Sequence, residues 1–230
     1  MNDDAKRTAR ALGACILGAC LAVGGCHRTP QPAPVVVPAN VPGPALPAPR
    51  APVDPAVTVL QPTGFQQGIQ DRIRLLASGP GQRVALDTVG YYMDVQQARL
   101  QQLRGFPVHR SGSRLLVTLA GASAFEPGSS TLSSATEAVL KPLSVILAEY
   151  SATVVSVHGH TDDSGTAAAN QQLSERRATV VARFLMAQGL RASRLVVVGH
   201  GASTSVTSNE SAAGREQNRR IELQIDPVTP

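Results

Sequence analysis

The stretch TVVSVHGHTDDSGTAAANQQLSERRATVVARFLMAQG, residues 153–189, joins a strand, a polar loop and a helix in one continuous segment. Residues 153–159 are β-branched and largely apolar, which predicts a buried strand. Residues 168–189 carry apolar side chains at helical spacing, and Gly189 is a residue type that commonly ends a helix. A strand followed by a helix of this length is typical of proteins in which helices pack against a sheet.

The same alternation continues on both sides of this segment. Residues 107–119 predict a hairpin with its turn at 111–113, and residues 133–151 predict a helix that Pro142 kinks or restarts. The later predicted elements are a strand at 193–201, a helical turn at 211–217 and a strand at 219–225. From residue 114 the order is therefore β-α-β-α-β-α-β, which predicts an α/β (α+β) fold with helices packed against a sheet and right-handed crossovers.

The N-terminus has the composition of an export signal. Lys6, Arg7 and Arg10 precede an apolar run at residues 11–25, which is shorter than the ~20 residues that a membrane-spanning helix needs. This pattern predicts a signal peptide over residues 1–25, with an uncleaved membrane anchor as the alternative.

The apolar run ends in VGGC, which resembles a bacterial lipobox with Cys26 as the lipidated residue. Cys20, in LGAC, is the alternative lipidation site. Several lipid chains on one cysteine would give stable attachment to a membrane. His27 stands where an aspartate usually retains lipoproteins in the inner membrane of enteric bacteria, so the outer membrane is favoured over the inner membrane.

Composition divides the remaining chain into three parts. Residues 26–62 hold eleven of the seventeen prolines, which predicts an extended linker between the anchor and a distant target; a segment without a spanning role is the alternative. Residues 63–112 predict a connecting region with two short helices, and residues 113–230 predict the folded domain.

Two polar residues fall within the predicted apolar stripe of helix 168–189. With 100° per residue, the expected core-facing positions are Leu173, Val180, Val181 and Phe184. Asn170 and Arg177 point in nearly the same direction, and a buried arginine needs an anionic partner. That partner is either Asp162 or Asp163, in an internal ion pair, or a bound anion. Asp162 and Arg177 together would suit a head group with one ammonium and one carboxylate on the same carbon.

A metal site is the alternative interpretation of the same segment. His158, His160 and Asp162 are residue types that bind zinc, and their spacing is reminiscent of the HxHxDH signature of metallo-β-lactamase-like hydrolases. Asp163 replaces the final histidine of that signature. A zinc-dependent hydrolase is therefore the alternative to a non-enzymatic interpretation without a metal or cofactor, in which Asp162 and Arg177 form either an internal ion pair or a binding pocket.

Four motifs in order resemble the OmpA-like C-terminal domain. They are GHTDDSG at 159–165, NQQLSERRA at 170–178, RLVVVGHG at 194–201 and NESAAGREQNRRIEL at 209–223. The similarity covers roughly residues 114–226. The upstream segment GYYMDVQQARLQQLRG resembles a subgroup of OmpA-family lipoproteins of Gram-negative bacteria.

This resemblance implies non-covalent binding of peptidoglycan through diaminopimelate, which carries a free ammonium and a carboxylate on one carbon. It implies that Asp162 and Arg177 contact this group and that Asn170 supports the ligand or the loop. Thr161 is expected as a further donor, and Arg219 is expected to steady the pocket.

These observations together predict a lipid-anchored protein of the Gram-negative outer membrane, whose domain faces the periplasm and tethers peptidoglycan to the membrane. Other envelope proteins are further candidate partners. Nucleic acid is not expected, because the net charge of +5 is not concentrated in a basic tract. An envelope adaptor with a vestigial pocket is a further alternative.

Overall fold

The computed structural model describes residues 57–79, 83–126 and 129–230. The predicted signal peptide, the lipidation sites Cys20 and Cys26, and most of the predicted linker lie outside this range. Within the described ranges, no helix is both long enough and apolar enough to cross a membrane.

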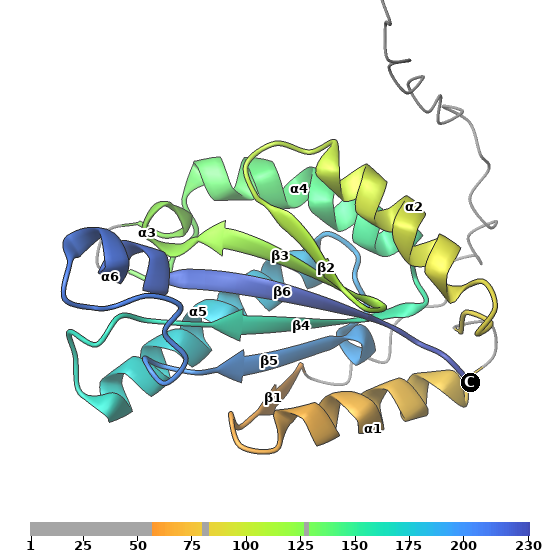
Figure 1. The fold of residues 1–230 in the computed structure, drawn as a ribbon, viewed down its shortest axis with the longest axis horizontal. Helices are drawn as coiled ribbons and strands as arrows, with labels where there is room; N and C mark the ends of the chain where they lie inside the picture. The colour runs from red at the N-terminus through yellow and green to blue at the C-terminus, as the bar shows by residue number, and fades with distance from the viewer. Residues whose placement is uncertain (1–56, 80–82, 127–128) are drawn as a thin grey trace, which may run out of the picture. The chain divides into compact units, whose positions relative to one another are not determined.

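The described residues form one mixed sheet with the strand order β1-β5-β4-β6-β3-β2 (Figure 1). The strands are β1 (Thr58–Leu60), β2 (Val108–Ser111), β3 (Arg114–Ala120), β4 (Thr153–Gly159), β5 (Leu195–Gly199) and β6 (Arg220–Pro227). β4 is parallel to β5 and antiparallel to β6. The C-terminal ends of β4 and β5 therefore lie at the same edge of the sheet as the N-terminal end of β6, and three loops meet there.

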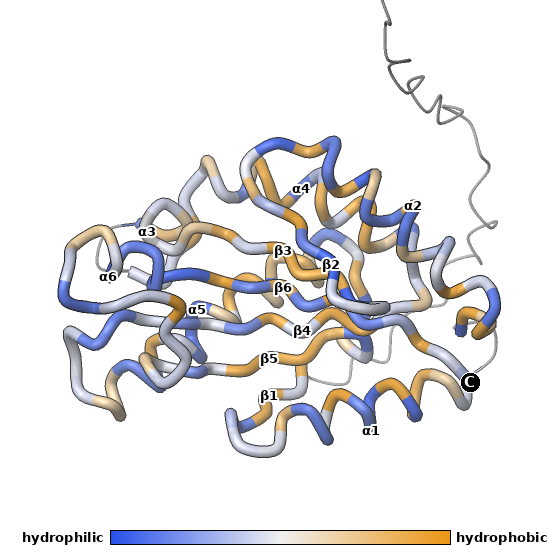
Figure 2. Tube along the Cα trace, in the orientation of Figure 1, coloured by the Kyte–Doolittle hydropathy of each residue, from blue (hydrophilic) through white to orange (hydrophobic). Residues whose placement is uncertain are grey.

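Helices cover both faces of this sheet. They are α1 (Phe65–Ala77), α2 (Val89–Gln101), α3 (Gly121–Ala124), α4 (Ser134–Glu149), α5 (Ala167–Ala187) and α6 (Ala212–Asn218), with a 3-10 turn at Ala192–Arg194. The main core joins residues of α2, α4 and α5 to one face of the sheet, on the side of Val155 and Val157. A smaller core joins α1 to the opposite face, on the side of Val154. Strand β5, which lies between β1 and β4 and contributes to both cores, is apolar along its length (Figure 2).

Helix α5 lies unusually close to the sheet because small residues meet at the contact. A Cβ atom at Gly159 would lie 2.1 Å from the carbonyl oxygen of Ser174, and one at Gly199 would lie 2.8 Å from the hydroxyl of Ser174. The buried residues of α5 are Asn170, Ser174, Ala178, Val181, Ala182 and Leu185. Leu173 and Phe184 are only half-buried. The predicted stripe centred on Leu173 is therefore wrong by about one residue, because close approach here depends on small side chains rather than large apolar ones.

The predicted fold class and the element order from residue 114 are confirmed, with the short helix α3 as an addition. Pro142 lies inside α4, and the helix continues through it without the restart that was one of the two expectations. The residue before Pro142 remains helical, although proline disfavours this conformation at the preceding position.

The end of the predicted linker 26–62 is wrong, because Thr58–Leu60 form β1. The prediction relied on the proline content of the whole segment and overlooked a short β-branched run, which pairs with β5. The region 63–112, predicted as a connector, contributes β2 to the sheet and α1 and α2 to the two cores.

Candidate functional site

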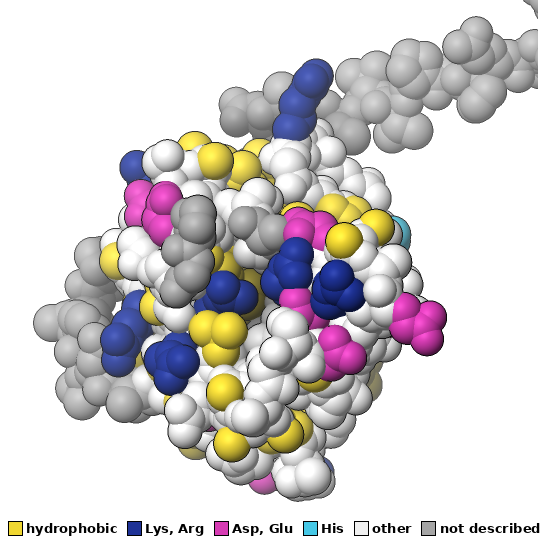
Figure 3. Space-filling model, turned by 90° about the vertical axis from the view of Figure 1, so that its left-hand side faces the viewer, with side chains coloured by type: hydrophobic (Ala, Val, Ile, Leu, Met, Phe, Trp, Pro, Cys, Tyr) yellow, Lys and Arg dark blue, Asp and Glu magenta, His cyan; other side chains and the backbone are white. Residues whose placement is uncertain are grey.

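A cleft of about 490 Å³ opens at the edge of the sheet where β4 and β5 end and β6 begins. Its lining includes all the residues singled out from the sequence as ligand-binding or supporting, namely Thr161, Asp162, Asn170, Arg177 and Arg219. Figure 3 shows this face of the molecule, on which several Lys or Arg side chains surround the hollow. The fold therefore gathers residues from the loop after β4, from the N-terminal half of α5 and from the end of α6.

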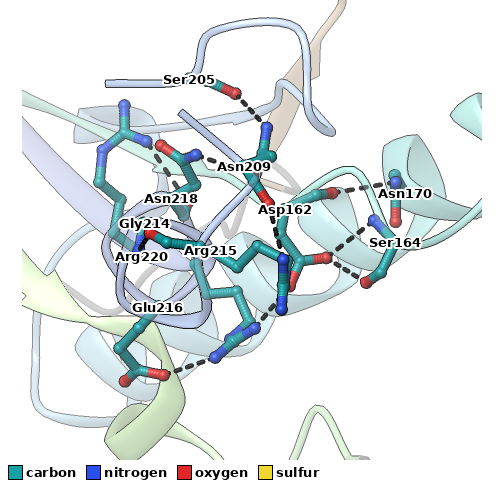
Figure 4. A network of polar contacts seen from close by, with 12 residues as sticks. Asp162, Ser164, Asn170, Ser205, Asn209, Gly214, Arg215, Glu216, Asn218 and Arg220 are labelled. Atoms are coloured by element: carbon teal, nitrogen blue, oxygen red, sulfur yellow. Dashed lines mark hydrogen bonds and ion pairs between the residues drawn. The ribbon is translucent and has the colours of Figure 1, made fainter. Parts of the chain in front are cut away.

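Asp162 is an ionised carboxylate at the base of this cleft. Its Oδ1 accepts hydrogen bonds from the backbone N–H of Ser164 at 3.1 Å and from the Ser164 hydroxyl. Its Oδ2 accepts from Nη1 of Arg219 at 2.5 Å (Figure 4). Burial by itself would raise the pKa of Asp162, but the hydrogen bonds from Ser164 and Arg219 outweigh it and lower the pKa. The side chain is only 8% exposed, and it carries a negative charge.

Arg219 connects two separate elements of the site. It lies at the C-terminal end of α6, and its Nη2 donates to Oε2 of Glu216 at 2.5 Å while Nη1 holds Asp162. The ion pair of Asp162 within the protein is therefore with Arg219 and not with Arg177, which was the internal pairing weighed from the sequence.

Arg177 is held beside the cleft without an anionic partner in hydrogen-bond distance among the described residues. Its Nη2 donates to the carbonyl oxygen of Ser129 at 3.2 Å, and its guanidinium carbon lies 4.9 Å from the ring centroid of Phe125. Its Nε is buried and has no hydrogen-bond partner within the same ranges. Burial lowers the pKa of Arg177, Arg219 lowers it further and Asp162 opposes them, yet an arginine remains protonated.

Asn170 and Thr161 shape the loop that carries Asp162. Nδ2 of Asn170 donates to the carbonyl oxygens of Asp162 at 3.1 Å and Gly165 at 3.4 Å, so it supports the loop directly. The backbone N–H of Thr161 donates to the carbonyl oxygen of Gly201 at 2.8 Å. The Thr161 hydroxyl is buried and has no hydrogen-bond partner among the residues described.

The histidines of the opening segment belong to a different part of the structure. Nδ1 of His158 lies 2.9 Å from Nε2 of His200, and the rings of His160 and His200 stack with centroids 4.7 Å apart. Phe65 of α1 contacts His158 and His200 edge-on. In the part of the chain that the structure describes, no three His, Cys, Asp or Glu side chains are arranged to hold a metal ion. The zinc-hydrolase hypothesis thus has no structural support.

Sequence reasoning did not identify several residues that organise this region. Ser164 holds Asp162, and Ser129 and Phe125 contact Arg177 from the segment before α4. The DDS sequence at residues 162–164 was a usable signal, because an aspartate commonly accepts from the backbone two residues later. The contacts of Ser129 and Phe125 are long-range and left no local pattern.

The sequence pattern described as the OmpA family matches residues 124–219, a range that contains every cleft residue discussed above. These residues form an OmpA family domain. The probable lipoprotein YiaD of Escherichia coli (strain K12) is 40% identical over 143 residues, which cover 61% of this chain and 65% of YiaD. The peptidoglycan-binding protein ArfA of Mycobacterium tuberculosis (strain ATCC 25618 / H37Rv) is 36% identical over 72 residues, which cover 31% of this chain and 22% of ArfA.

A solved structure shares the fold of this OmpA family domain. The cell wall anchor of the T6SS from Pseudomonas aeruginosa superposes with a TM-score of 0.52 at 27% identity, covering 59% of this chain and 96% of that chain. The chain spans slightly less than two thirds of the length of YiaD and less than a quarter of the length of ArfA. The elements β1, α1, α2, β2 and β3 all precede the matched range.

Proposed function

We propose that this chain binds peptidoglycan non-covalently and tethers it to a membrane. The observation that carries the proposal is that one cleft of an OmpA family domain is lined both by an ionised Asp162 and by Arg177, whose side-chain hydrogen bond among the described residues goes to a neutral carbonyl oxygen. The names of two similar proteins agree with it, since ArfA is a peptidoglycan-binding protein and the solved relative is a cell wall anchor.

The ligand group that fits this cleft best is the head of diaminopimelate. Its ammonium would donate to Asp162, whose two oxygens offer about four acceptor positions, and its carboxylate would accept from Arg177. Asn170 holds the loop in place, and the Thr161 hydroxyl is a further hydrogen-bonding group. Arg219 orients the Asp162 carboxylate and keeps it ionised. No bond is made or broken in this scheme, so the protein acts as a binding domain and not as an enzyme.

The membrane end of the tether is proposed to be a lipid on Cys26. A lipidated Cys26 would place the domain in the periplasm, at the outer membrane of a Gram-negative cell, with the proline-rich segment as the spacer. The similarity to a probable lipoprotein of E. coli supports this part of the proposal. Labelling with a lipid precursor tests it: Cys26→Ala should abolish incorporation while Cys20→Ala retains it, and the reverse result would move the anchor to Cys20.

The binding proposal is tested by co-sedimentation of the full-length chain, in detergent, with purified sacculi. The wild type should sediment, whereas Asp162→Ala and Arg177→Ala should remain largely in the supernatant with unchanged circular dichroism. Asp163→Ala is the matched control, because Asp163 is adjacent but exposed and does not line the cleft. Normal sedimentation of both cleft variants would refute the site, and a wild type that stays in the supernatant would favour an adaptor with a vestigial pocket.

A further inference from the structure

The cleft carries more positive charge than a zwitterionic head group requires. Its lining includes three guanidinium groups, those of Arg176, Arg177 and Arg219, and one carboxylate, that of Asp162. Arg219 pairs with both Asp162 and the neighbouring Glu216. Three positive charges against two negative ones leave an excess of one positive charge. A head group with one ammonium and one carboxylate is neutral, so it would leave this excess uncompensated.

The excess positive charge is carried by Arg176. It follows Glu175 on α5, lines the cleft and is exposed to solvent. The ion pairs within the described ranges involve other arginines, including Arg219 with Asp162 and Arg220 with Glu222, but not Arg176. A cleft lined mostly by one sign of charge attracts ligands of the opposite sign.

We propose that Arg176 is a specificity-determining residue that binds a second carboxylate of the peptide ligand. This inference rests on the proposed function, because it assumes that Asp162 and Arg177 hold the diaminopimelate head in the same cleft. A planar guanidinium can grip a carboxylate with two parallel hydrogen bonds. The preferred ligand is then an anionic stem peptide with free carboxylates, and amidation of the second carboxylate removes the group that Arg176 binds.

The chain offers a matched control for this residue on the same helix. Arg183 lies seven residues after Arg176, which places it on nearly the same face of α5 but two turns, or roughly 10 Å, farther along the axis. It is also exposed and does not line the cleft. Arg176→Gln and Arg183→Gln therefore remove the same charge from the same helix, one inside the cleft and one outside it.

The experiment is a calorimetric titration of the full-length chain with alanyl-γ-glutamyl-diaminopimelate. Two further peptides carry an amide either at the glutamate α-carboxylate or at the C-terminal carboxylate. Arg176→Gln should weaken binding of the unmodified peptide about three- to fivefold, the size expected for a solvent-exposed ion pair. One of the two amides should weaken wild-type binding by the same factor, and that amide should have no further effect on Arg176→Gln. Arg183→Gln should bind as the wild type does.

The inference would be overturned if each amide weakened binding by the same factor in the wild type as in Arg176→Gln. It would also be overturned if Arg176→Gln bound the unmodified peptide with wild-type affinity. Those results leave the proposed function intact as long as Asp162→Ala still abolishes binding. Absence of binding by the wild type to all three peptides would count against the proposed function as well. Raising the salt concentration should reduce the difference between the wild type and Arg176→Gln, because exposed charge pairs are screened.

Discussion

Arg219 donates to Asp162 at 2.5 Å and to Glu216 at 2.5 Å, so one guanidinium fixes the end of α6 to the loop after β4. The preceding residue, Asn218, binds a second loop: its Oδ1 accepts from the backbone N–H groups of Val206 at 2.9 Å and Thr207 at 3.2 Å. Two different loops are thus held by adjacent residues at the C-terminal end of one short helix.

Replacement of Arg219 by Gln should raise the pKa of Asp162. The variant loses a charged hydrogen bond that favours the carboxylate, while burial, which disfavours the charged form, remains. Sacculus binding should therefore decline at a higher pH than in the wild type as the solution is acidified. Carboxyl chemical shifts of Asp162 and co-sedimentation at several pH values measure both effects. Glu216→Gln is the control, since it leaves the Arg219–Asp162 bond in place. An unchanged titration of Asp162 in the Arg219 variant would contradict this prediction.

Gly159→Ala should destabilise the domain by about 3 kcal/mol or more, because overpacking of a close contact is costly. The added Cβ would lie 2.1 Å from the backbone oxygen of Ser174, so α5 would have to move away from β4. Gly90→Ala serves as the comparison, since a Cβ there meets no atom within 4 Å; it should stabilise helix α2 by up to about 1 kcal/mol. Urea unfolding measures both, and equal stability of the Gly159 variant and the wild type would show that the contact is loose.

The histidine cluster should make the fold less stable in acid. Burial lowers the pKa of His158 to about 3 and that of His200 to about 4, whereas a histidine in the unfolded chain has a pKa near ~6.5. As the pH falls below that value, the unfolded chain binds protons that the folded chain does not, so the free energy of unfolding decreases. The free energy of unfolding is therefore unaffected by these histidines above the pKa of the unfolded chain, and it decreases as the pH falls from there toward 3 to 4.

His158→Gln tests the contribution of one histidine to this acid sensitivity. The variant should reduce the slope of the unfolding free energy against pH by about 1.2 kcal/mol per pH unit between pH 6 and 5. His160 and Arg220 add positive charge near the cluster and Glu222 adds negative charge, and all three remain in the variant. Urea unfolding at closely spaced pH values gives the slopes, and parallel curves for variant and wild type would disprove the assignment.

Arg194→Lys should cost about 3 kcal/mol of stability. Arg194 is 2% exposed and donates to the carbonyl oxygens of Thr153, Leu147 and Tyr150 at 2.8 to 3.0 Å. Burial lowers its pKa to about 10, so it stays charged at neutral pH. A lysine ammonium cannot reproduce the planar arrangement of N–H donors in the guanidinium group, so buried carbonyl oxygens would lose their donors. Arg191→Lys, at an exposed position, should change stability by less than about 0.5 kcal/mol.

The elements that the sequence predicted well are those with strong local signals. The predicted strand 153–159 coincides with β4, because its β-branched residues are bounded by polar segments. Gly189 follows α5 with a φ of 99°, and the N–H groups of Gly189 and Leu190 donate to the carbonyls of Met186 and Leu185. β1 has three residues and takes its stability from β5, far later in the chain, so no local pattern could establish it.

For the site, the sequence predicted which residues would meet but not how they pair. Asp162, Asn170 and Arg177 were singled out from their positions around one helix start, and they do line one cleft. The choice between Arg177 and Arg219 as the partner of Asp162 depends on side-chain reach across two elements, which spacing does not encode. The contact between His158 and His200 also depends on the pairing of two separate elements. His158 of β4 lies opposite Val198 of β5, and His200 follows two residues later, so its ring reaches that of His158.

The direction of β1 has a mechanical consequence. β1 is parallel to β5, so its first residue, Thr58, lies at the end of the sheet opposite the cleft. Tension applied between the N-terminal side of Thr58 and a molecule held in the cleft is directed along the strands. All the backbone hydrogen bonds between β1 and β5 then share the load at once, rather than breaking one after another as in a zipper.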